Sequence, residues 1–298
     1  MSAKEFFSRG WTTRLGFWLG KYLPPKGGRF VGGLIARVLV TLKPDIYHAV
    51  YANQRRVLGE GVSEAALRWA VYRVFLNAAR AYYELFHNVG WGRVKVEDFY
   101  PCVRLLPESR EHIREALGSG RGVFFLGCHT SNFDLGGIAL SQFLPVPLQA
   151  LSLADPTPGF EVLNALRKQA GMMVTPIAPS SLRSAMGRLQ AGGAVITGVD
   201  RPLGEGDNPV EFFGMRAYLP TGYIRIPLRT RALVLTLGTC YEEGEYRIMV
   251  NPPLEMVHTG DRERDVQVNL QQVLAEIEGF IRRYPDQWMM FMPVWRNP

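Results

Sequence analysis

The chain has 298 residues, 47% hydrophobic and 20% charged, a composition that supports a buried core and excludes a disordered or low-complexity protein. Its three cysteines are odd in number and far apart, which argues against a disulfide framework and a cysteine-based zinc site. The net charge is +7, and residues 1–56 carry ten basic and two acidic side chains, so residues 57–298 sum to −1. Basic charge concentrated at one end argues against a nucleic-acid enzyme and favours contact with an anionic membrane.

Two apolar segments near the N-terminus are candidates for that contact. In Phe6–Leu23 a single helical face carries large apolar side chains: Trp11, Leu15, Trp18, Leu19 and Tyr22. In Phe30–Leu42 the apolar run is interrupted by Arg37 and is too short to span a bilayer. We predict that residues 1–44 form a membrane-associating helical segment. The alternative is a pair of ordinary helices packed on their own domain.

The rest of the chain, residues 45–298, predicts an α/β domain. Helices are expected at Ala49–Leu58 and Glu64–His87, then at Glu108–Leu117, Gly159–Gln169, Ser181–Ala191 and Gln267–Tyr284. Short apolar runs typical of buried strands occur at Val123–Cys128, Val146–Leu151, Met172–Ile177, Ala194–Val199, Ala232–Gly238 and Tyr246–Val250. The alternation predicts a mostly parallel central sheet flanked by helices, with amphipathic helices at the N-terminus.

The most informative segment follows the strand expected at Val123–Cys128. His129 lies directly after that strand, and Asp134 lies five residues further on, at the expected start of a helix. A strand–turn–helix corner lets Asp134 turn back toward His129, fix its tautomer and leave the other ring nitrogen as a general base. The alternative is a structural histidine with Asp134 as a helix cap. No nucleophilic serine elbow and no metal-ligand spacing is present in the sequence.

A second candidate region begins after the strand expected at Ala194–Val199. Asp200 and Arg201 open a loop, and Phe213 within it is a candidate for lining an acyl-chain pocket. Gly214 is a candidate for close backbone approach to a ligand. Arg167, on a helix between the two regions, is a candidate for binding phosphate or stabilising an oxyanion. Each of these residues also has an ordinary structural interpretation as core, turn or solvated surface.

The residues also resemble a known family. His129-Thr-Ser-Asn-Phe-Asp134 is similar to the H-x4-D/E motif of bacterial lipid A biosynthesis acyltransferases and of the related phosphatidylinositol mannoside acyltransferases. Further matches follow the family's order along most of the chain: Asn53-Gln-Arg-Arg-Val57, Arg167 with Gly171, Gly193 with Asp200-Arg201, Phe212-Phe-Gly214, Pro220-x-Gly222 and Tyr284-Pro-Asp-Gln-Trp288 with Trp295.

This resemblance implies a membrane-associated O-acyltransferase on the cytoplasmic face of the inner membrane. His129 would deprotonate a glycolipid hydroxyl, and Asp134 would orient His129. The acyl chain would come directly from acyl-CoA or acyl carrier protein, with no covalent intermediate, no metal and no cofactor. Asn132, Arg167, Asp200, Arg201, Phe213 and Gly214 would contact substrate. Membrane lipids and the acyl donor would be the partners, and nucleic acid would not.

Two departures separate the chain from the lipid A enzymes. The motif ends in Asp134, where those enzymes commonly have Glu, and no clean N-terminal transmembrane helix is present. Both features are closer to the mannoside branch. A lipid A acyltransferase and a catalytically silent lipid-binding module remain alternatives. Glu211 is a further carboxylate that could serve His129.

Overall fold

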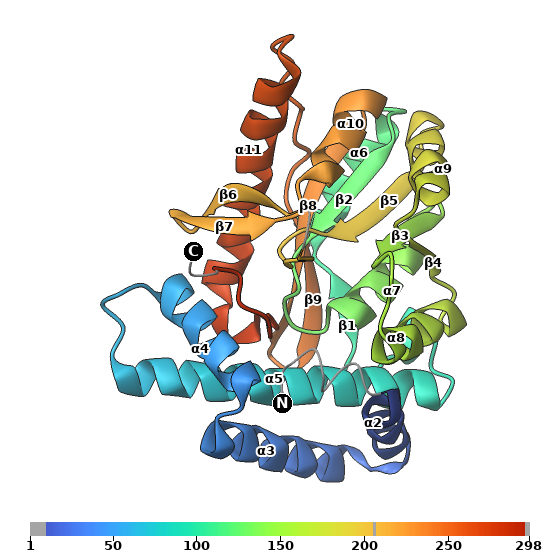
Figure 1. Cartoon of the computed structure of the whole chain (residues 1–298). Helices are drawn as coiled ribbons and strands as arrows, with labels where there is room; N and C mark the ends of the chain where they lie inside the picture. Colours follow the sequence, from blue (N-terminus) through green and yellow to red (C-terminus); the bar gives the residue numbers. More distant parts are fainter. Residues whose placement is uncertain (1–9, 205–206, 296–298) are drawn as a thin grey trace.

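The computed structural model describes residues 10–204 and 207–295 and has the α/β architecture that the sequence predicts (Figure 1). Seven strands form the main sheet in the order β1-β9-β8-β2-β5-β3-β4. All neighbours are parallel except β8 and β9. The strands are β1 (Val103–Leu105), β2 (Val123–Gly127), β3 (Leu148–Ser152), β4 (Met173–Pro176), β5 (Ala194–Gly198), β8 (Leu233–Glu242) and β9 (Glu245–Val250).

Helices cover both faces of this sheet. One face packs on α9 (Pro179–Gln190), α10 (Arg225–Thr230) and α11 (Arg262–Arg283). The other packs on α5 (Glu64–Gly90), α6 (Pro107–Gly118), α7 (Phe133–Phe143) and α8 (Pro158–Gln169). The two cores explain why the central strand β2 is apolar throughout, since its alternate side chains enter opposite faces.

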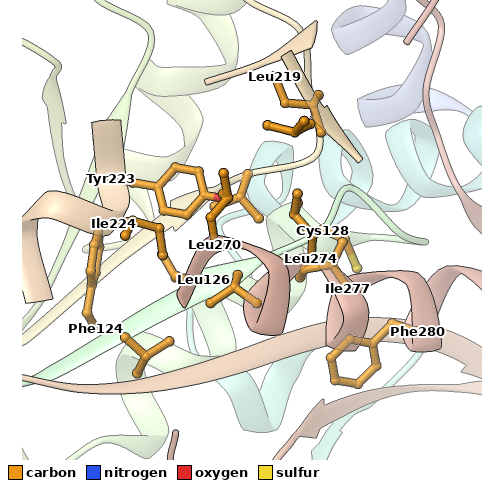
Figure 2. Packing of buried hydrophobic residues seen from close by; sticks show 14 of the residues in the cluster. Phe124, Leu126, Cys128, Leu219, Tyr223, Ile224, Leu270, Leu274, Ile277 and Phe280 are labelled. Carbon is orange, nitrogen blue, oxygen red and sulfur yellow. The ribbon is translucent and has the colours of Figure 1, made fainter. Parts of the chain in front are cut away.

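The core beside α11 shows this alternation directly. Phe124 and Leu126 of β2 belong to one cluster with Leu270 and Leu274 of α11, and Phe124 lies beside Ile224 of the 3-10 turn before α10 (Figure 2). Val123 and Phe125 belong to the opposite core. A shift of one residue in β2 would therefore exchange the contents of the two cores, which fixes the position of its C-terminal end.

The N-terminal helices form a separate layer outside α5. α2 (Gly10–Tyr22) and α3 (Pro25–Leu42) lie on the side of α5 away from the sheet, and α4 (Asp45–Leu58) packs on α5 nearer its start (Figure 1). Residues before Gly10 and the side chain of Trp11 lie outside the described part of the predicted Phe6–Leu23 helix. No helix among residues 10–204 and 207–295 is long and apolar enough to cross a membrane. The division of the chain at residue 44 stays a prediction.

Strand β1, helix α10 and a hairpin were not expected from the sequence. Residues following Asp200 form a two-stranded antiparallel hairpin, β6 (Asn208–Phe212) and β7 (Met215–Leu219). Phe213 and Gly214 make its turn with positive φ angles of 53° and 68°. Glycine adopts this conformation without strain, which accounts for Gly214. The remaining elements are three 3-10 turns: Val96–Asp98, Gly222–Ile224 and Pro285–Gln287.

Candidate active site

The register of two parallel strands places His129 beside Asp200. Gly127, the last residue of β2, pairs with Gly198, the last residue of β5. Residues two positions beyond each strand end therefore meet at the same edge of the sheet, where α/β proteins usually hold their ligands. His129 Nδ1 lies 2.5 Å from Asp200 Oδ1.

The Asp200 carboxylate is held by three N–H donors. Besides the ring of His129, its Oδ2 accepts hydrogen bonds from the His129 backbone N–H at 2.9 Å and from Trp288 Nε1 at 2.7 Å. Asp200 is completely buried. A buried carboxylate surrounded by donors is well compensated for its loss of water and is fixed in orientation.

These contacts determine the resting protonation of the pair. Burial alone would raise the pKa of Asp200, but the His129 ring and the N–H donors outweigh burial and hold that pKa below its usual value. Burial, together with the charge of Arg201, lowers the pKa of His129 despite the attraction of Asp200. The resting pair is an aspartate beside a neutral imidazole. Since an aspartate only accepts, the ring proton is on Nδ1, and Nε2 is left as a base.

The prediction that Asp134 bonds to the His129 ring was wrong. Asp134 instead forms an ion pair with Arg167, whose Nε and Nη2 are both 2.6 Å from Asp134 Oδ1. Arg167 Nη1 also donates to Asn164 at 2.7 Å. Asp134 lies in the first turn of α7, and α8 presents Arg167 to it, so the pair joins these two helices beside the His129 ring. Asp200 takes the orienting position that the sequence analysis gave to Asp134.

A glycine makes room for the His129 ring. A Cβ atom placed on Gly198 would lie 2.6 Å from His129 Cε1 and 3.2 Å from Nε2. These distances are shorter than carbon contacts in proteins, so any side chain at this position would displace the ring. Phe133 closes another side of the imidazole in a T-shaped arrangement, with 4.8 Å between ring centroids.

A cavity adjoins this pair and has two kinds of wall. Its charged groups are Asp134, Arg167 and Arg201 beside His129. The rest is mainly apolar and comes largely from the sheet: Ala150, Met172, Val174, Ile196 and Leu237. Gly137 of α7 also lines the cavity. A Cβ atom there would lie 3.3 Å from Met172 Cε, so a larger residue at position 137 would occupy part of the cavity. The arrangement is suited to a ligand with a polar reacting end and an apolar chain.

Arg201 is the cation of this cavity that retains an unused donor. Its Nε is buried and has no hydrogen-bond partner among the described residues. Its guanidinium stacks on Phe160 at 5.2 Å from the ring centroid. Arg167, in contrast, already donates to two side-chain acceptors. A negative charge that develops near His129 would therefore find its free donor on Arg201.

Four other candidate residues lie elsewhere. Asn132 is buried and serves the scaffold, accepting from the Leu135 N–H as the cap of α7 and donating to the Ala81 carbonyl. Phe213 packs against Trp288, and its backbone N–H donates to Glu278. Neither it nor Gly214 is in the wall of this cavity, and their contact with substrate stays a prediction. Glu211 is exposed on the hairpin, and Asp200 is the carboxylate bonded to His129.

Two residues of the site were not assigned a role from the sequence. Gly198 carries a weak signal, since a glycine at the end of a buried strand is typical of close approach by another group. Trp288 belongs to the Tyr284-Pro-Asp-Gln-Trp288 run, but nothing local connects it to Asp200, which is 88 residues away.

Comparisons with known proteins identify the family of the chain. Residues 5–297 match the family model described as bacterial lipid A biosynthesis acyltransferase. The phosphatidylinositol mannoside acyltransferase of Mycolicibacterium smegmatis is 23% identical to this chain, over 62% of this chain and 60% of that protein. The phosphatidylinositol mannoside acyltransferase of Mycobacterium tuberculosis H37Rv is 24% identical, over 62% of this chain and 58% of that protein. The chain thus spans about three fifths of each relative's length. A solved 1-acyl-sn-glycerophosphate acyltransferase from Thermotoga maritima aligns with a TM-score of 0.36 at 12% identity, over 84% of this chain and 96% of that one.

Proposed function

Because the chain belongs to the bacterial lipid A biosynthesis acyltransferase family, we propose that it transfers a fatty acyl chain from a thioester to a hydroxyl group of a membrane glycolipid. The observation that carries this proposal is the His129–Asp200 pair against a cavity with an apolar wall. The pair supplies a base for the hydroxyl, and the apolar wall supplies space for the chain.

The proposed reaction is a direct transfer. His129 Nε2 removes the proton from the acceptor hydroxyl while that oxygen attacks the thioester carbonyl carbon. Asp200 stabilises the imidazolium that forms. Arg201 donates to the carbonyl oxygen as it becomes negative. The C–S bond then breaks, the imidazolium returns its proton to the departing thiolate, and the ester and free thiol leave. No metal or cofactor takes part.

The acyl donor is acyl-CoA or acyl carrier protein, whose common element is the thioester. The acceptor class follows from the relatives, which are named for acylating phosphatidylinositol mannosides. A mannosyl hydroxyl is therefore the first acceptor to test. A lipid A acceptor is the second candidate, because the matching family model is described by it.

Peripheral binding to the cytoplasmic face of the inner membrane is part of the proposal. The small residues of α2 and α3 face α5: a Cβ on Gly20 or on Gly28 would collide with Phe86 or Tyr83. Phe17, Leu39 and Val40 also pack inward. Most of the other large apolar side chains point the other way and are about half or more exposed: Leu15, Trp18, Tyr22, Phe30, Leu34, Ile35, Val38 and Leu42. A helix packed only on its own domain would have the reverse arrangement.

Charge supports the same orientation. Exposed basic side chains lie among these apolar ones: Arg14, Lys26, Arg29, Arg37 and Lys43. An apolar face with basic residues is typical of a helix that lies in the plane of an anionic bilayer.

Membrane binding is tested by sedimentation with phosphatidylglycerol vesicles. Replacing Phe30 and Leu42 by serine should weaken binding severalfold, because each side chain is 73% exposed. The control replaces Arg262 and Arg264, exposed at the far end of the molecule from α3, by glutamine (Figure 1). Equal binding of all three proteins would contradict the proposal.

Activity is tested by transfer of radiolabel from acyl-CoA and from acyl carrier protein to extracted mycobacterial and lipid A-containing lipids. Wild type and the control His48→Ala, at an exposed position of α4, should produce one labelled lipid that His129→Ala does not. Its identity distinguishes the mannoside from the lipid A acceptor. Equal label with His129→Ala would reject the proposed base. Vesicle binding without label from any donor would favour the alternative of a non-catalytic lipid-binding module.

A further inference from the structure

The last described residues form part of the candidate active site. We call residues 285–295 the C-terminal strap. Its Trp288 is 1% exposed and donates its indole N–H to Asp200 Oδ2 at 2.7 Å. That oxygen is on the far side of the carboxylate from the one bonded to the His129 ring. The strap and the His129 backbone N–H therefore share Oδ2, while the His129 ring bonds Oδ1.

The strap also fixes the turn that carries His129. The Met289 N–H donates to the His129 carbonyl at 2.8 Å, and the Ser131 N–H donates to the Gln287 carbonyl at 2.7 Å. These bonds form a short antiparallel bridge between Thr130 and Trp288. Ser131 has a positive φ of 50°, a conformation that a non-glycine residue holds only when its surroundings determine it. One segment thus sets the position of both members of the pair.

Side-chain amides of α4 and α5 hold the strap in turn. Asn53 donates to the carbonyls of Met290 and Met292 at 3.1 and 2.8 Å and accepts from the Val294 N–H at 3.2 Å. Gln54 donates to the Pro285 carbonyl at 2.7 Å. Asn77 donates to the Asp286 carbonyl, also at 2.7 Å. We call these three residues, Asn53, Gln54 and Asn77, the clamp on the strap.

An aromatic cluster fixes the indole ring. Trp288 contacts Phe212, Phe213 and Trp295, with ring centroids 6.2 to 6.5 Å apart. The ring is not in the wall of the cavity. Its polar contact with the site is the N–H aimed at Asp200.

We propose that Trp288 is a positioning residue for catalysis: its indole N–H fixes the Asp200 carboxylate in the orientation that aligns His129 as a base. This inference rests on the role of His129 in the proposed function. Three donors share the charge of Asp200, and the Trp288 N–H is the one that belongs neither to His129 nor to the substrate. Without it, Oδ2 keeps one donor, the His129 backbone N–H, so the carboxylate is held less firmly and retains more of its negative charge for the His129 ring.

Other ionisable groups around the pair are accounted for. Arg201 and Asp134 act on His129 with opposite signs. Cys128 and Tyr223 are close enough to feel the charge of Asp200, but burial raises the pKa of each well above neutral pH, so both stay uncharged. A change in the titration of His129 after a change at Trp288 therefore reports on Asp200.

The test compares Trp288→Phe with Trp295→Phe. Both tryptophans lie on the strap and in the same cluster, but the Trp295 N–H donates to the Phe212 carbonyl instead of to Asp200. Trp288→Phe should reduce kcat about tenfold or more with little change in KM. It should also move the acidic limb of the pH profile of kcat/KM to higher pH, because an Asp200 with fewer donors favours the protonated, charged form of His129. Trp295→Phe should leave the pH profile unchanged.

A second measurement separates this inference from the proposed function. Titration of the His129 ring by NMR requires no substrate and should show a raised pKa in Trp288→Phe alone. If wild type proves inactive with every donor and acceptor, this titration still decides whether Trp288 acts on the pair. If Trp288→Phe does not fold, 3-benzothienylalanine at position 288 removes the N–H and keeps the ring shape. An unchanged His129 titration, or a kcat equal to that of Trp295→Phe, would overturn the inference.

Discussion

Replacing Glu84 by glutamine should make the protein more resistant to alkaline pH. Glu84 lies in α5 with only 7% of its surface exposed, and the Tyr246 hydroxyl donates to its carboxylate. Burial raises the pKa of Glu84 from 4.5 to about 7, and the opposing effects of Tyr246 and of two arginines do not offset it. The folded protein thus holds a proton here that the unfolded chain releases.

The magnitude follows from linkage. A carboxyl group whose pKa is raised in the folded state stabilises that state fully below pH 4.5, and this contribution is lost as the pH rises through about 7. One pKa unit corresponds to about 1.4 kcal/mol, so about 3 kcal/mol is lost between pH 5 and pH 8. Glutamine keeps the shape and an acceptor for Tyr246 and does not titrate. The free energy of unfolding of Glu84→Gln relative to wild type should rise by that amount over this interval.

Urea unfolding at pH 5, 6, 7 and 8, followed by far-UV circular dichroism, measures this difference. His129 contributes with the opposite sign, because its lowered pKa adds stability as pH rises, but it is present in both proteins and cancels. Glu60→Gln, at an exposed position shortly before the same helix, is the control and should follow wild type. Parallel pH profiles for wild type and Glu84→Gln would refute a proton held at Glu84.

Three further predictions concern the site. Asp200→Asn should lower kcat about a hundredfold or more, because the amide cannot stabilise a charged His129, while Asp134→Asn should cost less, since it weakens a neighbouring ion pair. Gly198→Ala should reduce kcat about a hundredfold by displacing the His129 ring, which is checked by steady-state kinetics. Gly137→Leu should shift the donor preference toward shorter acyl chains, measured as kcat/KM across a series of chain lengths.

Controls for these variants come from positions with free space. Gly187→Ala on α9 adds a methyl group with no atom within 4 Å and should retain wild-type kinetics. Equal rates for Asp200→Asn and wild type would reject the orienting role of Asp200. A Gly198→Ala enzyme with unchanged kcat, or a Gly137→Leu enzyme with unchanged chain-length preference, would reject the corresponding placement of the ring or of the acyl chain.

Most of the sheet and its helices could be predicted because most strands of the sheet are short runs of mainly apolar residues. The run predicted at Val123–Cys128 became β2, and that predicted at Ala194–Val199 became β5, each within one residue. The β6–β7 hairpin was missed because glycine and proline dominate the loop around it. Strand β6 is only five residues long, and Val210 and Phe212 are its only alternating apolar residues, too few to indicate a strand.

The site was predicted less completely because its contacts are not local. His129 and Asp200 were each singled out, but His129 was paired with Asp134, its neighbour along the chain. The correct partner follows only from the fact that β2 and β5 are adjacent and in register, which depends on the order of strands in the sheet. The family resemblance located Trp288 without indicating that its N–H reaches Asp200.

The clamp on the C-terminal strap has a consequence for folding kinetics. Asn53 bonds carbonyls 237 and 239 residues further along the chain, and Asp200 joins partners 71 and 88 residues away. Closing long loops adds little to the equilibrium cost, which grows only with the logarithm of loop length. It slows folding, since distant segments must meet before their contacts stabilise anything. During refolding, helix formation should therefore precede the return of catalytic competence, and activity should report the final step of assembly.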